Sequence, residues 1–181
     1  GASYLWSTGA VTASITTSMP GTYSVQVTVN GCSASDAMDL TNHALPVFDL
    51  GPDQTICAGT STSFSATVAG ATYAWSTGAG TNSITTGTAG TYWLDVTTNG
   101  CTVRDSVDLF VTPLPVVDLG PDLSICPSIN ATLDATNAGA TYSWSTGAVT
   151  PSISVGPGSY DVTVTASGCS AGDAITIGAY P

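Results

Sequence analysis

Apolar and polar residues alternate along several short stretches of this chain, with the period of two that half-buried β-strands show. Residues 91–98 (TYWLDVTT) place Tyr92, Leu94 and Val96 on one face, and residues 62–68 (TSFSATV) alternate in the same way. Asn99-Gly100 then marks a tight two-residue hairpin. Further short strands are predicted at residues 47–50, 72–77, 83–86 and 101–111. About six or seven short strands with turns every 8–12 residues or so are typical of a β-sandwich of the immunoglobulin type.

The pattern occurs three times along the chain at a fixed spacing, which identifies internal repeats. The words YLWSTGA, YAWSTGA and YSWSTGA begin at residues 4, 73 and 142, so the repeat length is 69 residues. FDLGPDQTIC at residues 48–57 likewise returns as VDLGPDLSIC at residues 117–126. Leu-Pro pairs at residues 45–46 and 114–115 mark the joints. The chain therefore divides into a first module (residues 1–46), a second module (47–115) and a third module (116–181).

The first module is shorter than the other two. Gly1 aligns with Gly70 and Gly139, so counterparts of the early strands and of the early cysteine are expected to be absent from it. We therefore expect the sequence to be a window on a longer repeat protein. Each DLGPD segment belongs to its own module, so no such segment is left over to be donated to a neighbouring copy.

The aromatic residues of the repeated words are predicted to face the core of each module. These residues are Tyr4, Trp6, Tyr23, Tyr73, Trp75, Tyr92, Tyr142, Trp144 and Tyr160. The serines that follow the tryptophans could be proposed as nucleophiles, but activation needs a base within hydrogen-bond reach. One histidine, His43, cannot serve three copies, and the chain has no Lys or Glu. The repeated words are therefore interpreted as structural parts, and no catalytic residue is predicted.

The five cysteines are interpreted as members of disulfides. Cys57 with Cys101 and Cys126 with Cys169 would each close a loop of 43 or 44 residues, which is worth on the order of 4 kcal/mol in the chain-entropy model. Cys32 would then need a partner outside this sequence. A disulfide within a module requires that both of its cysteines lie at the same end of that module. The usual seven-stranded order does not place them there. Either one short strand is absent, or the early cysteine lies on a segment that crosses between the sheets, and the sequence leaves both options open. Disulfides imply an oxidising, extracellular location.

Charge excludes several classes of partner. The chain carries 12 acidic residues, all Asp, against the single base Arg104, for a net charge of −11. Nucleic acids and anionic membranes need clustered Lys and Arg, so neither is an expected partner. No apolar run reaches the roughly 20 residues that span a bilayer. No cofactor is predicted.

Two features outside the core could bind something. Aspartates gather near the joints, and their oxygens are ligands that a weak calcium site could use. Solvated turn residues are the simpler interpretation. The calcium candidates are Asp49, Asp53, Asp105, Asp108, Asp118 and Asp122. Trp93 follows a core position, so it should face outward, where the other modules have Ser24 and Asp161. An outward tryptophan could contact a glycan or a protein, or could cover a sheet edge.

Residues and motifs quoted above carry a family resemblance. The pattern LGPDxxIC, AxYxWSTGA, SI, G(T/S)YxV, GC and DxV resembles the immunoglobulin-like and PKD-like repeats of large Bacteroidetes surface proteins, among them gliding-motility-associated adhesins exported by type IX secretion. WSTG stands where the PKD-type repeat has WDFGD, which favours the immunoglobulin-like label. Asp105-Ser106-Val107 resembles the O-glycosylation sequon of that phylum, which makes Ser106 a candidate sugar acceptor.

Together these observations predict a non-catalytic structural segment, a stalk or extracellular filament, of a secreted or cell-surface repeat adhesin. Its partners would be the other modules of the same chain and other copies in a filament. One alternative is a binding module that engages a glycan or surface protein through Trp93 and the loops. A second alternative is a set of accessory domains from a secreted enzyme.

Overall fold

The computed structural model describes residues 1–181, and all of its regular structure is β. Fifteen strands form five sheets, and none of the sheets crosses from one module into another. The structure contains no helix that is long and apolar enough to cross a membrane. The all-β prediction from the alternating pattern is confirmed.

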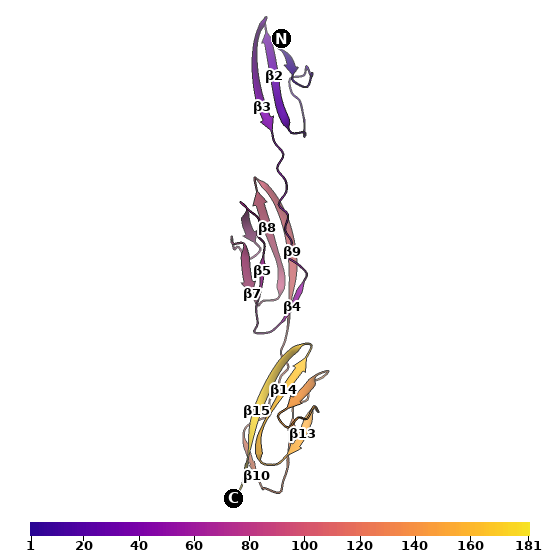
Figure 1. Ribbon diagram of the computed structural model, residues 1–181, viewed down its shortest axis with the longest axis vertical. Coiled ribbons are helices and arrows are strands. Elements are labelled where there is room, and N and C mark those ends of the chain that lie inside the picture. Colours follow the sequence, from indigo (N-terminus) through magenta and orange to yellow (C-terminus); the bar gives the residue numbers. More distant parts are fainter. The chain divides into compact units, whose positions relative to one another are not determined.

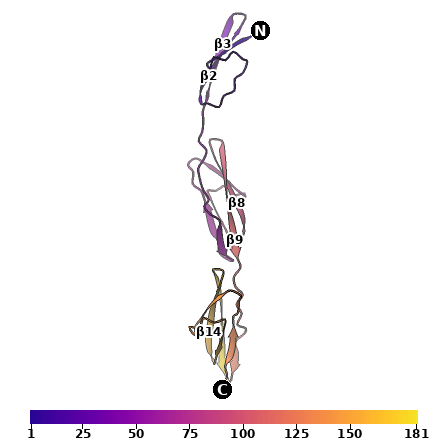
Figure 2. The same ribbon diagram turned by 90° about the vertical axis from the view of Figure 1, so that its right-hand side faces the viewer.

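The second module is a sandwich of two sheets. One sheet has the order β4-β9-β8-β6 and the other pairs β5 with β7, and Figure 1 shows β5 and β7 as a layer beside β8 and β9. The strand bounds are β4 Gln54–Cys57, β5 Thr62–Ser65, β6 Thr72–Trp75, β7 Ser83–Thr86, β8 Gly90–Thr98 and β9 Cys101–Thr112. Figure 2 shows β8 and β9 side by side as a long hairpin.

The third module repeats this arrangement, with sheets β10-β15-β14-β12 and β11-β13. Its strands are β10 Leu123–Ile125, β11 Ala131–Asp134, β12 Thr141–Trp144, β13 Ser152–Val155, β14 Gly158–Ala166 and β15 Cys169–Ala179. The first module has one sheet, in the order β1-β2-β3. Its strands are β1 Ser3–Trp6, β2 Gly21–Val29 and β3 Cys32–Leu40.

Each sandwich encloses a core built from the alternating positions. In the second module Phe64, Leu94 and Val96 are almost fully buried, and the ring centroids of Phe64 and Tyr92 lie 5.7 Å apart. The third module buries Leu133, Val162, Val164, Ile175 and Ile177 in the same way. Hydrophobic burial of this kind is the main favourable term in folding each module.

The predicted strand at residues 47–50 is wrong, because the first strand of the second module begins later, at Gln54. Leu50 nevertheless lies in the core with 7% of its surface exposed. Asp49 accepts a hydrogen bond from the backbone N–H of Gly51 at 2.7 Å, so the chain turns there, and Gly51 has a positive φ of 84°. The apolar run therefore anchors the module before the strand begins.

The register of the first strand contradicts both predicted disulfides. β4 pairs with β9 in parallel and places Cys57 opposite Thr112, at the far end of the strand that Cys101 begins. Eleven residues of strand span about 36 Å, whereas a disulfide needs Cα atoms within roughly 7 Å. β10 and β15 place Ile125 opposite Ala179 in the same parallel way, so Cys126 lies far from Cys169. The predicted pairs Cys57–Cys101 and Cys126–Cys169 are therefore wrong.

Contacts divide the chain into two compact units. One unit contains Gly1–Val47 together with Thr97–Val103, which is the turn between β8 and β9 and the strand ends beside it. The other unit contains Phe48–Val96 and Arg104–Pro181, and so holds most of the second module and all of the third.

Candidate functional site

A disulfide joins the second module to the third. It links Cys57, the last residue of β4, to Cys169, the first residue of β15, with 5.6 Å between the Cα atoms and 112 residues between the two positions in sequence. The Sγ atom of Cys57 also lies 3.9 Å from the backbone oxygen of Gly168. Cys169 is buried, with 3% of its surface exposed. The bridge therefore connects the early cysteine of one module to the late cysteine of the next.

The late cysteine is presented by the same turn in every module. Asn30-Gly31, Asn99-Gly100 and Ser167-Gly168 all have positive φ at both residues, between 49° and 82°. Two residues in this conformation make the tight hairpin turn that matches the twist of the flanking strands, as the Asn-Gly pair predicted. The residue after each turn is a cysteine, namely Cys32, Cys101 and Cys169. Cys32, Cys101 and Cys126 are free thiols, with Cys32 and Cys126 exposed.

The repeated Trp-Ser-Thr-Gly words close a turn between strands. The serine hydroxyl oxygens accept hydrogen bonds from backbone N–H groups of the neighbouring strand, at 3.2 Å from Ser24 to Ser7, 3.3 Å from Trp93 to Ser76 and 3.1 Å from Asp161 to Ser145. Each serine oxygen thereby ties its turn to the backbone of the neighbouring strand. The geometry assigns these serines a positioning role in the turn.

The tryptophans of these words lie inside the fold and are hydrogen-bonded there. Trp75 and Trp144 are 2% and 3% exposed. Their indole N–H groups donate to the backbone oxygens of Thr81 and Thr150, both at 2.8 Å. Trp6 donates in the same way to Thr12 at 2.9 Å but is only partly buried. The tyrosines of the words are buried or partly buried as well.

The aspartates near the joints hold the leading segment of each sandwich against its last strand. Asp105 accepts the backbone N–H of Leu50 at 2.9 Å, and Asp173 accepts that of Leu119 at 2.8 Å. The N–H of Leu119, with a further bond from the N–H of Ala174, lowers the pKa of the Asp173 carboxyl from its usual value.

The other aspartates named as calcium candidates make similar bonds. Asp53 accepts the N–H of Asp108, and Asp122 accepts that of Thr176. Asp118 accepts the N–H of Gly120 within its own turn. The chain contains no group of three or more His, Cys, Asp or Glu side chains that could hold a metal. Calcium binding at these aspartates stays a prediction.

Trp93 lies on the outer face of β8, where it is only partly buried. The guanidinium of Arg104 stacks over its ring at 3.7 Å from the centroid. Arg104 also donates two hydrogen bonds of 2.6 Å to Asp95, a hydrogen-bonded pair that lowers the pKa of the Asp95 carboxyl. The single arginine of the chain thus covers one face of the outward indole. Ser106, the candidate sugar acceptor, is exposed on β9, and its glycosylation stays a prediction.

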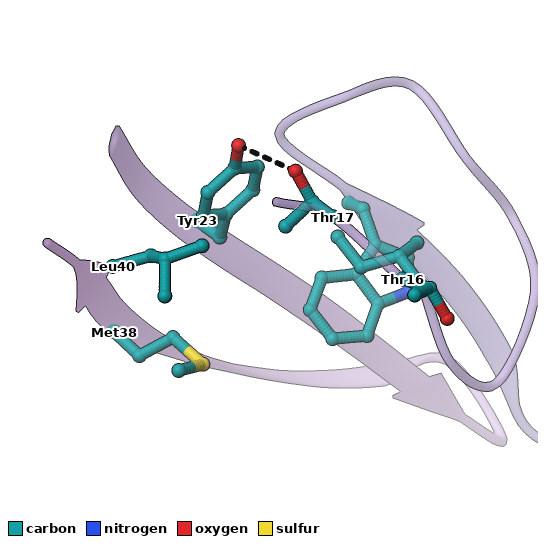
Figure 3. Close-up of a pocket in the computed structure, with 7 residues that line it drawn as sticks. Thr16, Thr17, Tyr23, Met38 and Leu40 are labelled. Atoms are coloured by element: carbon teal, nitrogen blue, oxygen red, sulfur yellow. Dashed lines mark hydrogen bonds between the residues drawn. The ribbon is translucent and has the colours of Figure 1, made fainter. Parts of the chain in front are cut away.

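The first module carries an apolar hollow on the open side of its sheet. The hollow is lined by Trp6, Ile15, Thr16, Thr17, Tyr23, Met38 and Leu40. Figure 3 shows Tyr23, Met38 and Leu40 side by side, and the hydroxyl of Tyr23 bonded to Thr17. Met38 is 62% exposed, whereas its counterparts Val107 and Ile175 are 1% and 2% exposed.

Solved structures with a similar fold are known, although no sequence relative was found. No family model matches the chain, and no curated protein matches it in sequence. Among solved structures, a mutated variant of a three-immunoglobulin-domain titin structure aligns over 99% of this chain and 88% of that chain, with a TM-score of 0.56 and 12% identity. A titin I-band fragment aligns over 92% of this chain and 77% of that chain, with a TM-score of 0.51 and 12% identity. Extracellular domains 3–5 of Drosophila OTK align over 99% and 86%, with a TM-score of 0.45 and 11% identity.

The likeness to the two titin structures shows the class of fold. The chain is a tandem array of immunoglobulin-like β-sandwich modules, as the strand pattern and the repeat predicted. At 12% identity the likeness concerns the fold alone. In this chain a disulfide also runs from one module to the next.

Sequence reasoning missed this bridge although the signal was present. Cysteines recur at two fixed places in the repeat, and that recurrence allows pairing within a module or between neighbours. The choice depends on whether the first strand runs parallel or antiparallel to the last, which the alternating pattern does not specify.

Proposed function

We propose that this chain is a load-bearing structural segment of a secreted or cell-surface repeat protein that works in adhesion. The observation that carries the proposal is the Cys57–Cys169 bridge, which joins two successive modules covalently. Tandem modules that contact only their neighbours form quasi-one-dimensional proteins. A covalent link at the joint would keep such modules together under tension.

The bridge also supports the proposed location. Disulfides persist in oxidising compartments and are rare where glutathione and thioredoxin keep thiols reduced. A single bridge over 112 residues stabilises the folded chain by about 5 kcal/mol in the chain-entropy model. The resemblance to Bacteroidetes surface adhesins is in keeping with this location.

A module swap tests the structural role. The second module (residues 47–115) is replaced by a copy of the third (residues 116–181) in the protein that contains this chain, and adhesion of cells or coated beads is measured. The copy supplies an early and a late cysteine but has Asp161 where the second module has Trp93. The structural role predicts unchanged adhesion, and loss of adhesion with the bridges intact would contradict it.

A binding role for Trp93 is the second candidate. Partial exposure of the indole favours it, but Arg104 already stacks on one face of the ring. Binding to a glycan array that is lost on Trp93→Ala, and kept on the matched Tyr4→Phe, would establish this role.

A further inference from the structure

The first module differs from the other two at four places around the position that β4 and β5 occupy in the second module, and a fifth difference concerns a thiol of the second module itself. The apolar hollow of Figure 3 is the first difference. In the second module the equivalent side chains are covered by Leu50, Phe64 and Ala66, which are 7%, 1% and 6% exposed. The first module has no counterpart of these three residues.

The second and third differences concern strands. Residues 14–17 (SITT) are identical in sequence to β7, Ser83–Thr86, yet they form no strand. β7 is a strand because β5 pairs with it, from Phe64 opposite Ile84 to Thr62 opposite Thr86. Likewise β3 stops at Leu40, whereas its counterpart β9 continues to Thr112 along the parallel partner β4. Both edges therefore have unpaired backbone groups that can accept a further strand.

The fourth difference is a carboxylate oxygen. In the complete modules one oxygen of Asp105 or Asp173 accepts the N–H of a leucine in the leading segment. Asp36 is the counterpart in the first module, and it bonds through one oxygen to the N–H of Ala37 as Asp105 does to Ser106. Its second oxygen has no partner, in the position where the leucine N–H would arrive.

The fifth difference is a thiol. Cys169 of the third module receives the early cysteine of the module before it. Cys101 is its counterpart in the second module, follows the same turn and is free. The segment that carries it, Thr97–Val103, belongs to the same compact unit as Gly1–Val47.

We propose that the open face of the first module is a binding site for one polypeptide segment, the leading strand pair of a repeat module of this kind, with the residue pattern of residues 47–69. Its Leu50 and Phe64 positions fill the apolar hollow, and its leucine N–H donates to Asp36. Its two strands extend the sheet along β3 and pair with residues 14–17, which is β-strand addition at two edges. Its cysteine then faces Cys101.

The covalent step is a thiol–disulfide exchange. The bound segment enters as a mixed disulfide with glutathione, the thiolate of Cys101 attacks the segment's cysteine sulfur, and the new S–S bond forms as glutathione leaves as a thiolate. One disulfide is consumed and one is formed, so no further oxidant is needed.

The probe is a synthetic peptide with the sequence of residues 47–69, VFDLGPDQTICAGTSTSFSATVA, added to the full chain with its own bridge intact. A version with serine at the cysteine position measures non-covalent binding by calorimetry. Hydrogen exchange should show new protection at residues 14–17 and 32–43 and no change in the third module. A peptide with Phe64→Ala should bind at least about tenfold more weakly, because it leaves the hollow unfilled.

The cysteine-containing peptide, supplied as its glutathione mixed disulfide, identifies the thiol. We expect the adduct on Cys101, with Cys32 and Cys126 modified at least about tenfold more slowly although both are more exposed. Equal modification of the three thiols, or absence of protection at residues 14–17 and 32–43, would overturn the proposal. So would a dimer of the chain that covers the same residues and that the peptide does not displace, since a second copy would then be the occupant.

Discussion

The first and second modules share several repeated words, and the structure shows these words in two different states. SITT is a loop at residues 14–17 and a strand at residues 83–86. Trp6 is partly exposed and Trp75 is 2% exposed, although both donate the same indole hydrogen bond. The difference between the modules is the segment that holds β4 and β5. Local sequence therefore specifies the hairpins and turns, whereas burial and strand pairing at the edges depend on a segment that lies elsewhere in the chain.

Truncation of the repeated tryptophans should give the largest difference in stability loss between the two modules. We expect Trp75→Ala to lower the free energy of unfolding of the second module by about 3–5 kcal/mol, the usual cost of deleting a buried large aromatic. Trp6→Ala should cost less than about half of that, because one side of Trp6 already faces the open hollow. Hydrogen exchange resolved by module measures both losses, and equal losses would contradict the comparison.

Acid should destabilise the third module through Asp173. The backbone N–H of Leu119 lowers the pKa of Asp173, so the folded state favours the carboxylate. This contribution is fully present above the unfolded pKa of about 3.9, and it is lost as the pH falls through the lower folded pKa.

Unfolding of the third module between pH 6 and pH 2 measures this effect. Asp173→Asn should flatten the loss of stability with falling pH, while Asp36→Asn, whose outer oxygen has no partner, should leave the profile of the third module unchanged. A profile that Asp173→Asn does not alter would show that the bond to Leu119 does not stabilise the fold.

Removal of the serine hydroxyl from a repeated word should lower the stability by a smaller amount. The three copies of the word allow the same substitution to be measured three times in one chain. Ser76→Ala removes one acceptor for the Trp93 N–H on an exposed turn, and we expect a loss of about 0.5 kcal/mol. Ser7→Ala and Ser145→Ala should cost similar amounts, because their bonds have similar lengths. Chemical denaturation of the three variants checks this, and a loss above about 2 kcal/mol in one variant alone would indicate a role specific to that serine.

Chelation should have the smallest effect. The joint aspartates accept backbone N–H groups, so we expect EDTA to leave the thermal midpoints of the chain unchanged. A midpoint that falls with EDTA and recovers with added calcium would support the calcium hypothesis instead.

Much of the fold could be predicted from the sequence. The alternation around Leu94 and Val96 predicted a strand with a buried face, and Asn99-Gly100 predicted the hairpin turn that has positive φ at both residues. The position of Trp93 predicted that it faces outward, but the sequence did not show that Arg104 stacks on it, since that contact joins two strands.

The recurrence of the cysteines allows two pairings, and the choice between them could not be predicted, for a physical reason. Residues 47–57 contain one apolar run and one cysteine, and nothing in them specifies that β4 lies parallel to β9. That orientation, together with the register that sets Cys57 opposite Thr112, places Cys57 at the opposite end of the module from Cys101. Cys57 therefore pairs with a cysteine of the next module, Cys169.

Force spectroscopy on the single chain, held at its two ends, tests the central claim that the bridge locks neighbouring modules together. With Cys57–Cys169 intact, the 112 residues of the loop cannot extend even when both modules unfold. Reduction, or the double variant Cys57→Ser with Cys169→Ser, should add roughly 370–400 Å to the unfolded contour length. The variant Cys101→Ser should add nothing. Equal contour lengths in the oxidised chain and the double variant would contradict the account.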